Sequence, residues 1–258
     1  MNKLMQGKKG LVIGVANKKS IAWKIAESLN KEGAKLAFTY QNEFVGKKAI
    51  PLFRELDSVF YDQLDVTDDE NFVHFFNKLE KAFDGDLDFL VHSVAGGPQK
   101  EDLQGNYYDT TRMGFVKSME ISVYSFVRAI QLSVPMMRGR NASAISLSYY
   151  GAEKVVPNYN VMGVAKAALE ASVRYLADDL GQSGIRINAL SPGPVLTRAA
   201  SGVSDFRILL RSFADKSPMK RLITTEEIAK SALYLLSDLS SGVTGEIIHV
   251  DGGYNIKA

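Results

Sequence analysis

The chain has 258 residues, of which 46% are apolar and 23% are charged, and its formal net charge is +2. This length and composition suit one large buried core, so we expect a single domain over residues 1–258. The charges form no basic stripe or arm, which argues against nucleic-acid or membrane partners. The absence of cysteine excludes disulfides and thiolate chemistry, and it fits a reducing, cytoplasmic compartment.

Histidine spacing and apolar run length exclude two further classes. His74, His92 and His249 lie far apart in the sequence, so we expect no metal site. The apolar run near the amino terminus, LVIGVA, is far shorter than the ~20 residues that a membrane span needs.

Seven short apolar runs bounded by Gly, Asp or Asn predict buried strands, and segments with helical periodicity lie between most of them. Such alternation is typical of a Rossmann-type, doubly wound parallel sheet with helices on both faces. The strands are GLVIGVA, KLAFTY, SVFYDQLDV, LDFLVHSVA, SAISLS, IRINALS and EIIHVDGG. The helices are expected at 20–31, 68–83, 114–137, 159–180 and 224–236.

Ligands of such sheets bind at the carboxyl ends of the strands, which gives the first strand–loop–helix special weight. Gly14 follows the first strand, and Ser20 can cap the next helix with its hydroxyl, leaving first-turn amides for a pyrophosphate. The loop lacks the standard glycine fingerprint of dinucleotide sites. By itself it fits an ordinary capped helix equally well.

The next three strand ends favour a dinucleotide. Gln41 follows the second strand with no adjacent arginine, which favours a cofactor without a 2′-phosphate, NADH rather than NADPH. Asp65 and Val66 end the third strand and suit an adenine edge and face, although Asp65 alone fits a helix cap equally well. The fourth strand ends in SVAGG, whose small residues let a ligand approach the backbone.

Tyr159 and Lys166 are seven residues apart on a predicted helix, so they share one face. An isolated pair of this kind is more often a core tyrosine and a lysine that reaches the surface. Tyr149, at the end of the preceding strand, changes that balance because two phenols and an ammonium group then converge beside the dinucleotide. We expect Lys166 to hold the nicotinamide ribose and to lower the phenol pKa, which describes a hydride-transfer site.

The spacing departs from the common short-chain dehydrogenase pattern, in which the tyrosine stands four positions before the lysine. Here that position is Met162, and Tyr149 occupies the usual serine position. The stretch SYYGAEKVVPNYNVMGVAKAALEASVRYLA, with FTYQNE before it and AASGVSDFR and SGVTGEIIHVDGGY after it, resembles bacterial enoyl-acyl carrier protein reductases of the divergent short-chain dehydrogenase type. The resemblance covers nearly the whole chain.

The resemblance implies NADH-dependent reduction of trans-2-enoyl thioesters in fatty-acid elongation, an acyl carrier protein partner and a homotetramer. It implies that Tyr159 steadies the enolate, Tyr149 lies near the substrate, Gly97 lies on the substrate side, and a substrate-binding flap spans about 197–220. The cofactor contacts that it implies are Gly14, Ser20, Ile21, Gln41, Asp65, Val66, Val94, Lys166, Val195, Leu196, Thr197, Arg198 and Ala199. Leu196 and Arg198 are exchanged relative to the family pattern.

Geometry explains why the tyrosine would move along its helix. An enoyl thioester receives hydride two bonds beyond its carbonyl carbon, so the oxyanion develops farther from the hydride than in a ketone. Three residues of helix move the tyrosine by ~4.5 Å. Two alternatives remain at this point: a ketone or alcohol dehydrogenase, which the missing Tyr-x3-Lys spacing disfavours, and a non-catalytic dinucleotide sensor, which the intact tyrosines and lysine disfavour.

Overall fold

The protein is represented by a computed structural model that describes residues 3–195 and 206–257. Seven strands form one sheet in the order β3-β2-β1-β4-β5-β6-β7, and every neighbouring pair is parallel. The predicted doubly wound parallel sheet is therefore confirmed. The strands are β1 Lys9–Ile13, β2 Lys35–Tyr40, β3 Phe60–Gln63, β4 Phe89–His92, β5 Ser143–Leu147, β6 Arg186–Pro192 and β7 Ile247–Val250.

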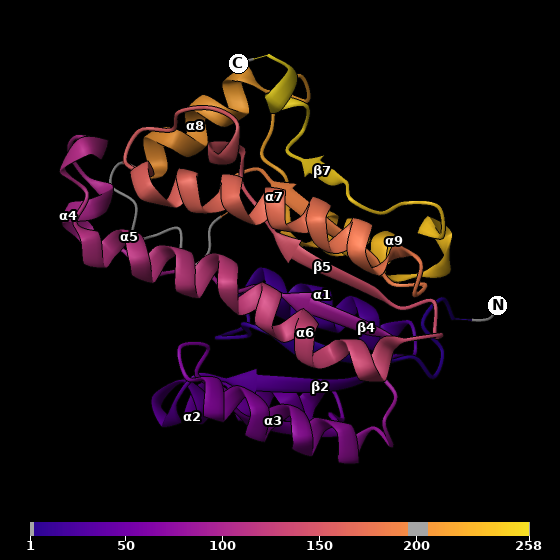
Figure 1. The fold of residues 1–258 in the computed structure, drawn as a ribbon. Helices are drawn as coiled ribbons and strands as arrows, with labels where there is room; N and C mark the ends of the chain where they lie inside the picture. Colours follow the sequence, from indigo (N-terminus) through magenta and orange to yellow (C-terminus); the bar gives the residue numbers. More distant parts are fainter. Residues whose placement is uncertain (1–2, 196–205, 258) are drawn as a thin grey trace.

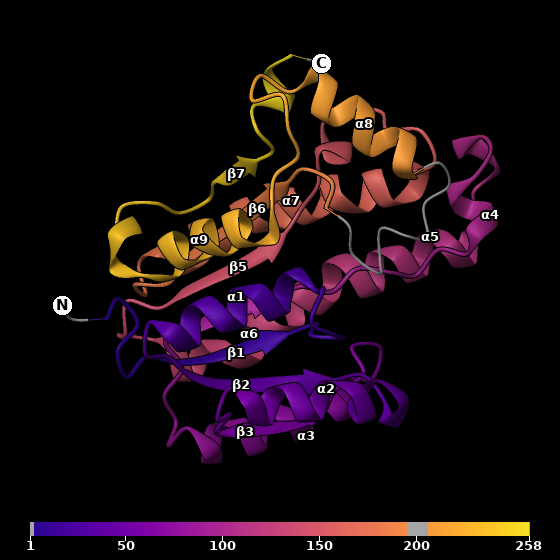
Figure 2. The same cartoon turned by 180° about the vertical axis from the view of Figure 1, so that it is seen from behind.

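Helices cover both faces of the sheet. Figure 1 shows α3, α6 and α7 in front of the strands, and Figure 2 shows α1, α2 and α9 on the other face. Helices α4, α5 and α8 gather at the end of the molecule away from the amino terminus. The helices are α1 Ile21–Lys31, α2 Glu43–Glu55, α3 Asp69–Ala82, α4 Lys100–Leu103, α5 Arg112–Met119, α6 Ser125–Met137, α7 Asn160–Gly181, α8 Phe206–Lys216 and α9 Thr225–Leu236.

Each face of the sheet has its own apolar core. On one face, Trp23 and Leu29 of α1 pack in the same cluster as Ala232 and Leu236 of α9, although these helices lie near opposite ends of the sequence. On the other face, the side chains of α3, α6 and α7 pack against the strands. This packing matches the two-sided burial expected of a parallel sheet, and it fixes the strand ends in space.

Three local features differ from the sequence expectation. Helix α2 was not predicted, because Gly46 and Pro51 interrupt its pattern, yet Asn42 caps it by accepting from the amide of Val45. The helix predicted over 114–137 consists of α5, a π-helical turn at Glu120–Tyr124, and α6. The edge strands β3 and β7 are only half-buried, since each has a neighbour on one side alone.

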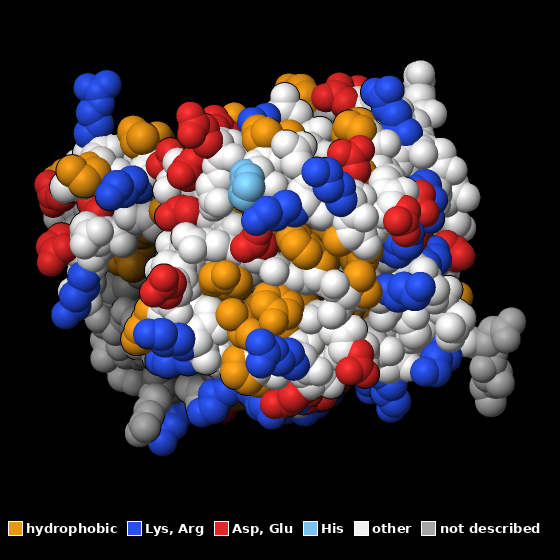
Figure 3. Space-filling view, turned by 90° about the horizontal axis from the view of Figure 1, so that it is seen from below, with side chains coloured by type: hydrophobic (Ala, Val, Ile, Leu, Met, Phe, Trp, Pro, Cys, Tyr) orange, Lys and Arg blue, Asp and Glu red, His pale blue; other side chains and the backbone are white. Residues whose placement is uncertain are grey.

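Charges of both signs are interspersed on the face seen in Figure 3, which views the molecule from the side of α2 and α3. Hydrophobic side chains gather near the centre of this face. Among the helices of the described residues, none is long and apolar enough to cross a membrane.

Candidate active site

A cavity of about 540 Å³ lies at the carboxyl ends of β1, β2 and β4. The chain leaves β1 for β2 on one side and later returns to β4 on the other, so this is the switch point where doubly wound sheets bind ligands. Seven of the predicted site residues line it, and they come from segments far apart in the sequence. They are Gly14, Ile21, Gln41, Val66, Val94, Gly97 and Lys166.

The glycine loop after β1 fits a ligand that approaches the backbone closely. Gly14 has a φ of +104°, and a β-carbon there would lie 2.1 Å from the carbonyl oxygen of Ser93. The prediction that Ser20 caps α1 is wrong. Its hydroxyl instead donates to the carbonyl of Asn17 and accepts from the amides of Ala16 and Asn17. The hydroxyl thereby braces the loop, and the first turn of α1 has no side-chain cap.

The loops after β2 and β3 line the adjoining part of the cavity. Gln41 is exposed at its rim, directly before Asn42, the residue that caps α2. Asp65 does not line the cavity; its carboxylate accepts hydrogen bonds from the amide and hydroxyl of Thr67. Nor does it cap α3, because Asp68 does so. The adenine contact of Asp65 therefore stays a prediction, whereas Val66 faces the cavity.

The π-helical turn shapes the far wall of the cavity. Its residue Ile121 lines the cavity, and the hydroxyl of Ser122 both accepts from the amide of Gly96 and donates to its carbonyl. Gly97 has a φ of +113°, and a β-carbon there would lie 2.4 Å from the backbone of Lys117. The small residues after β4 are thus required by close backbone packing as well as by access for a ligand.

Tyr149 and Tyr159 lie against each other at the end of β5 and the start of α7. Their rings meet edge to face, with centroids 4.9 Å apart, and the buried hydroxyl of Tyr149 has no hydrogen-bond partner among the described residues. Burial raises the pKa of both phenols well above the usual range. The expectation that Lys166 lowers the phenol pKa is therefore wrong for this structure, because burial dominates, and both groups remain protonated donors at neutral pH.

Lys166 is almost fully buried on α7, and its side chain reaches into the cavity. Its ammonium group donates to the carbonyl oxygen of Leu147 at 2.6 Å. Burial lowers the pKa of Lys166 to about 8, and Glu170 acts in the opposite direction. The lysine is therefore mostly charged at neutral pH and is placed to donate further hydrogen bonds into the cavity.

Not all predicted site residues meet in the cavity. Ser20, Asp65, Tyr149 and Tyr159 are absent from its lining, although the two tyrosines lie near Lys166 along the same elements. Val195 is buried in the core shared by α1 and α9. The remaining predicted cofactor contacts, Leu196, Thr197, Arg198 and Ala199, lie outside the described residues.

Sequence reasoning missed several residues of the wall. Thr39 lies near the end of β2, Leu64 follows β3 and Leu147 ends β5. Their places at strand ends were the available signal. In the described part of the chain, no group of three or more His, Cys, Asp or Glu side chains could hold a metal ion.

Comparison with known proteins agrees with this geometry. A family model described as enoyl-(acyl carrier protein) reductase matches residues 14–255. The enoyl-acyl-carrier-protein reductase (NADH) 1 of Rhizobium meliloti (strain 1021) is 52% identical over 252 residues, which cover 98% of this chain and 92% of the relative.

Two solved structures match with bound cofactors. The reductase of Anaplasma phagocytophilum, in complex with NAD, is 48% identical with a TM-score of 0.94, and the match covers 100% of this chain and 98% of that one. The Bacillus cereus enoyl-acyl carrier protein reductase, with NADP+ and indole naphthyridinone, is 44% identical with a TM-score of 0.95 over 99% of both chains. This chain belongs to the enoyl-(acyl carrier protein) reductase family.

Proposed function

We propose that this protein is an NADH-dependent enoyl-acyl carrier protein reductase that acts in fatty-acid elongation. The observation that carries the proposal is the buried phenol hydroxyl of Tyr149, which has no hydrogen-bond partner among the described residues and whose ring packs on Tyr159. This tyrosine comes shortly after Leu147, whose carbonyl binds a lysine that reaches into the switch-point cavity. The family to which the chain belongs supports the same reaction.

The cavity suits a dinucleotide. The uncapped first turn of α1 would hold the pyrophosphate, Gln41 the adenosine ribose, and Val66 the adenine face. Lys166 would bind the hydroxyls of the nicotinamide ribose. The reduced nicotinamide, when bound, supplies the hydride that goes to the β-carbon of the enoyl thioester.

The two tyrosines would act on the thioester oxygen, where negative charge develops after hydride addition. Because its pKa is raised, Tyr159 keeps its proton and donates a hydrogen bond to that oxygen. Tyr149, whose buried hydroxyl has no partner within the described ranges, would lie near the same substrate. Preorganised donors of this kind stabilise a developing oxyanion without needing a base.

NADH is the expected cofactor because no arginine stands in the segment 40–44, at the end of β2. A 2′-phosphate would therefore find no bidentate partner there. The Bacillus cereus structure contains NADP+, so the preference needs a direct test. We expect a clearly higher kcat/KM with NADH at low salt. Equal efficiencies, or a preference for NADPH, would contradict this assignment.

The defining experiment offers an enoyl thioester and a 3-ketoacyl thioester of matched chain length with NADH. We expect rapid reduction of the carbon–carbon double bond, because a ketone placed to receive hydride would hold its oxygen too far from Tyr159 for a hydrogen bond of ~2.6–3.2 Å. Mass spectrometry identifies the products. Comparable ketone reduction would favour a ketone dehydrogenase, and no turnover with either would favour a cofactor sensor.

We propose an acyl carrier protein as the natural carrier of the substrate, which cations on and after α8 would attract. Arg211 and Lys216 are exposed, whereas Arg221 is held by Glu227 at 2.7 Å. Replacing Arg211 and Lys216 with glutamine should lower turnover of carrier-linked substrate at low salt and spare the coenzyme A thioester. Equal effects on both thioesters would remove this support.

We further propose a homotetramer working in the cytoplasm. Apolar side chains on α5 and α7 support association, because Met113, Val116 and Tyr175 are 64%, 53% and 76% exposed. Light scattering would measure the mass in solution. A monomer at micromolar concentration would overturn the tetramer.

A further inference from the structure

Three consecutive residues at the end of β5 each contact a residue of α7 or its N-cap. The carbonyl of Leu147 accepts from Lys166, the hydroxyl of Ser148 donates to the carboxylate of Glu170, and the ring of Tyr149 packs on Tyr159. Ser148 stands between the two residues that contact the proposed catalytic groups. The site lysine and the site tyrosine are therefore both held through this one short segment.

Glu170 is an unusual residue for its position. It is only 7% exposed, and it lies one helical turn after Lys166, which is 4% exposed. It does not line the switch-point cavity, so it does not meet the cofactor there. Burying a carboxylate is costly unless it is paired and hydrogen-bonded, which indicates that its partners explain its presence.

Glu170 and Lys166 are both buried and lie one helical turn apart on α7, and the carboxylate favours the protonated lysine. Burial raises the pKa of Glu170, and Glu153, which follows the 3₁₀ turn Tyr150–Ala152, acts in the same direction. The hydrogen bond from Ser148, His249 on β7 and Arg174 on the same helix act in the opposite direction. His249 is itself bound to Glu153, at 2.7 Å. On the lysine side, His92 of β4 is neutral, because burial lowers the pKa of His92 to about 3.

We propose that Glu170 is a positioning residue for the reaction, fixing Tyr149 through Ser148 and keeping the buried Lys166 protonated through its charge. The proposal rests on the proposed function for the role of Tyr149 but only on dinucleotide binding for the role of Lys166. The two tasks use different properties of one side chain. The carboxylate oxygen accepts the hydroxyl proton of Ser148, and the negative charge acts on the ammonium group.

The charge has a consequence for pH dependence. Lys166 binds the cofactor in its protonated form, so affinity for NADH should fall as pH rises through the lysine pKa, which is about 8. Removing the charge of Glu170 removes the group that raises this pKa, because an adjacent opposite charge favours the protonated lysine. The fall in affinity should then begin at lower pH.

The test is to measure NADH binding by fluorescence from pH 6 to 9.5, without thioester, for the wild type and Glu170→Gln. The glutamine amide oxygen can still accept from Ser148, so only the charge is lost. We expect the midpoint of the affinity loss to move to lower pH, with binding at pH 8 weakened by about threefold or more. Superimposable pH profiles would overturn the proposal.

Matched variants separate charge from hydrogen bonding. Asp178→Asn makes the same charge change at an exposed site on the same helix and should leave the midpoint in place. Ser148→Ala removes the bond to Glu170, and we expect kcat for the enoyl thioester to fall by about tenfold, with a smaller change in the KM for NADH. An unchanged kcat in Ser148→Ala would refute the positioning of Tyr149.

Two further measurements keep the outcome unambiguous. Thermal unfolding identifies any variant that has not folded. If Glu170→Gln does not fold, Glu170→Asp, which retains the charge, is measured in its place. We expect its midpoint to match the wild type, and a shift to lower pH would count against the charge role. If the wild type binds NADH but reduces no enoyl thioester, the proposed function fails while the binding profiles still test Glu170.

Discussion

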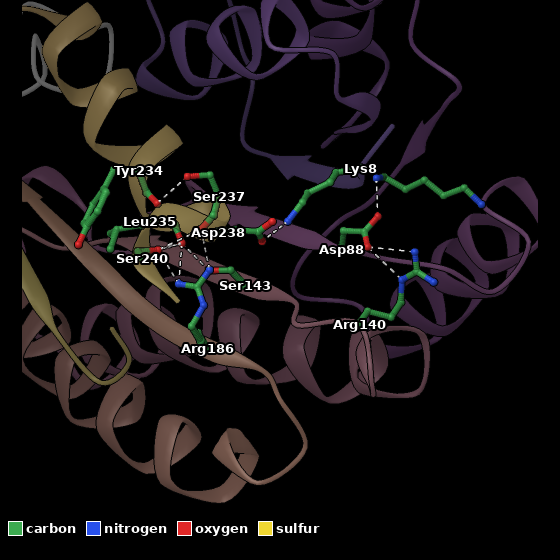
Figure 4. Close-up of polar contacts among 11 residues, drawn as sticks. Lys8, Asp88, Arg140, Ser143, Arg186, Tyr234, Leu235, Ser237, Asp238 and Ser240 are labelled. Carbon is green, nitrogen blue, oxygen red and sulfur yellow. Dashed lines mark hydrogen bonds and ion pairs between the residues drawn. The ribbon is translucent and has the colours of Figure 1, made fainter. Parts of the chain in front are cut away.

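Polar groups at the amino ends and at the carboxyl ends of the strands differ in how fully they are hydrogen-bonded. At the amino ends of the strands, Arg140 bonds to Asp86 at 2.6 Å and to Asp88 at 3.0 Å. Arg186, the first residue of β6, donates to four acceptors, including the hydroxyl of Ser240 at 2.7 Å. Figure 4 shows Arg140 pointing toward Asp88, and Arg186 pointing toward Leu235, Ser237 and Ser240.

At the carboxyl ends, polar groups keep unused hydrogen-bonding capacity. Among the described residues the buried hydroxyl of Tyr149 has no partner, and the first turn of α1 has no side-chain cap. Lys166 binds the carbonyl of Leu147 and can donate further hydrogen bonds into the cavity. Unsatisfied buried groups reduce stability, so a fold retains them where a ligand will complete them. We therefore expect substitutions at the amino edge to change stability and substitutions at the carboxyl edge to change function.

The largest effect is expected at the carboxyl edge. Tyr159→Phe should lower kcat for the enoyl thioester by ~10²–10³ while NADH affinity stays nearly constant, since only an oxyanion donor is lost. Lys166→Ala should instead weaken NADH binding. Tyr234→Phe, at an exposed position of α9, is the control and should change neither quantity. Equal losses of NADH affinity in the Tyr159 and Lys166 variants would contradict this division of roles.

The second effect belongs to the amino edge. Arg186→Met should lower the free energy of unfolding by about 2–3 kcal/mol, because several half-buried carbonyl and hydroxyl groups lose their shared donor. Its kcat/KM should remain that of the wild type. Arg138→Met, at an exposed site, should stay within about 0.5 kcal/mol of the wild type. Urea unfolding measures both; a kinetic defect in folded Arg186→Met would break the comparison of the two edges.

A third prediction separates backbone strain from cavity shape. Gly14→Ala and Gly139→Ala both place a side chain at positive φ, but only at position 14 does the β-carbon meet another backbone, that of Ser93. We expect Gly14→Ala to weaken NADH binding by about tenfold or more through a displaced strand end, and Gly139→Ala to cost only ~1 kcal/mol of stability. Calorimetric titration measures the NADH affinity of both variants. Similar affinities would show that the cavity tolerates the displaced strand end.

The smallest effect is expected at the cap of α9, whose first turn lies near the carboxyl ends of β6 and β7. Glu227 completes a capping box with Thr224 at the start of α9, and its pKa is lowered to about 2, chiefly by Arg221. A lowered pKa contributes stability that is present above the unfolded-state value and is lost as pH falls toward 2. Glu227→Gln should cost less than about 1 kcal/mol at pH 7, and its deficit should shrink on acidification. A deficit independent of pH would exclude the charge as its source.

Much of the fold was predictable because each strand is a short apolar run with a polar boundary. Helix α2 was missed because Gly46 and Pro51 have low helix propensity and interrupt its pattern. Asn42 as a possible cap is a weak signal by itself. The π-helical turn was missed because its residues continue the helical periodicity on either side. Both are cases in which packing decides what local propensity leaves open.

Much of the site was predictable from residues that lie directly or shortly after a strand. Gly14 and Gln41 follow β1 and β2 directly, Val66 and Val94 come a few residues after β3 and β4, and all four line the cavity. The prediction for Ser20 was wrong because a serine before a helix usually caps it with its hydroxyl. Here that hydroxyl donates to the carbonyl of Asn17 in the preceding loop. Glu170 had no sequence signal, since a glutamate within a helix is ordinarily on the surface.

The packing of α1 against α9 has a consequence for synthesis of the chain. Helix α1 buries Trp23 and Leu29 under a helix whose first residue is Thr225. A ribosome that adds ~5–20 residues per second reaches that point roughly 10–40 s after completing α1. Throughout this interval the apolar face of α1 lacks its final cover, so we expect the nascent chain to expose this face to chaperones until α9 has emerged.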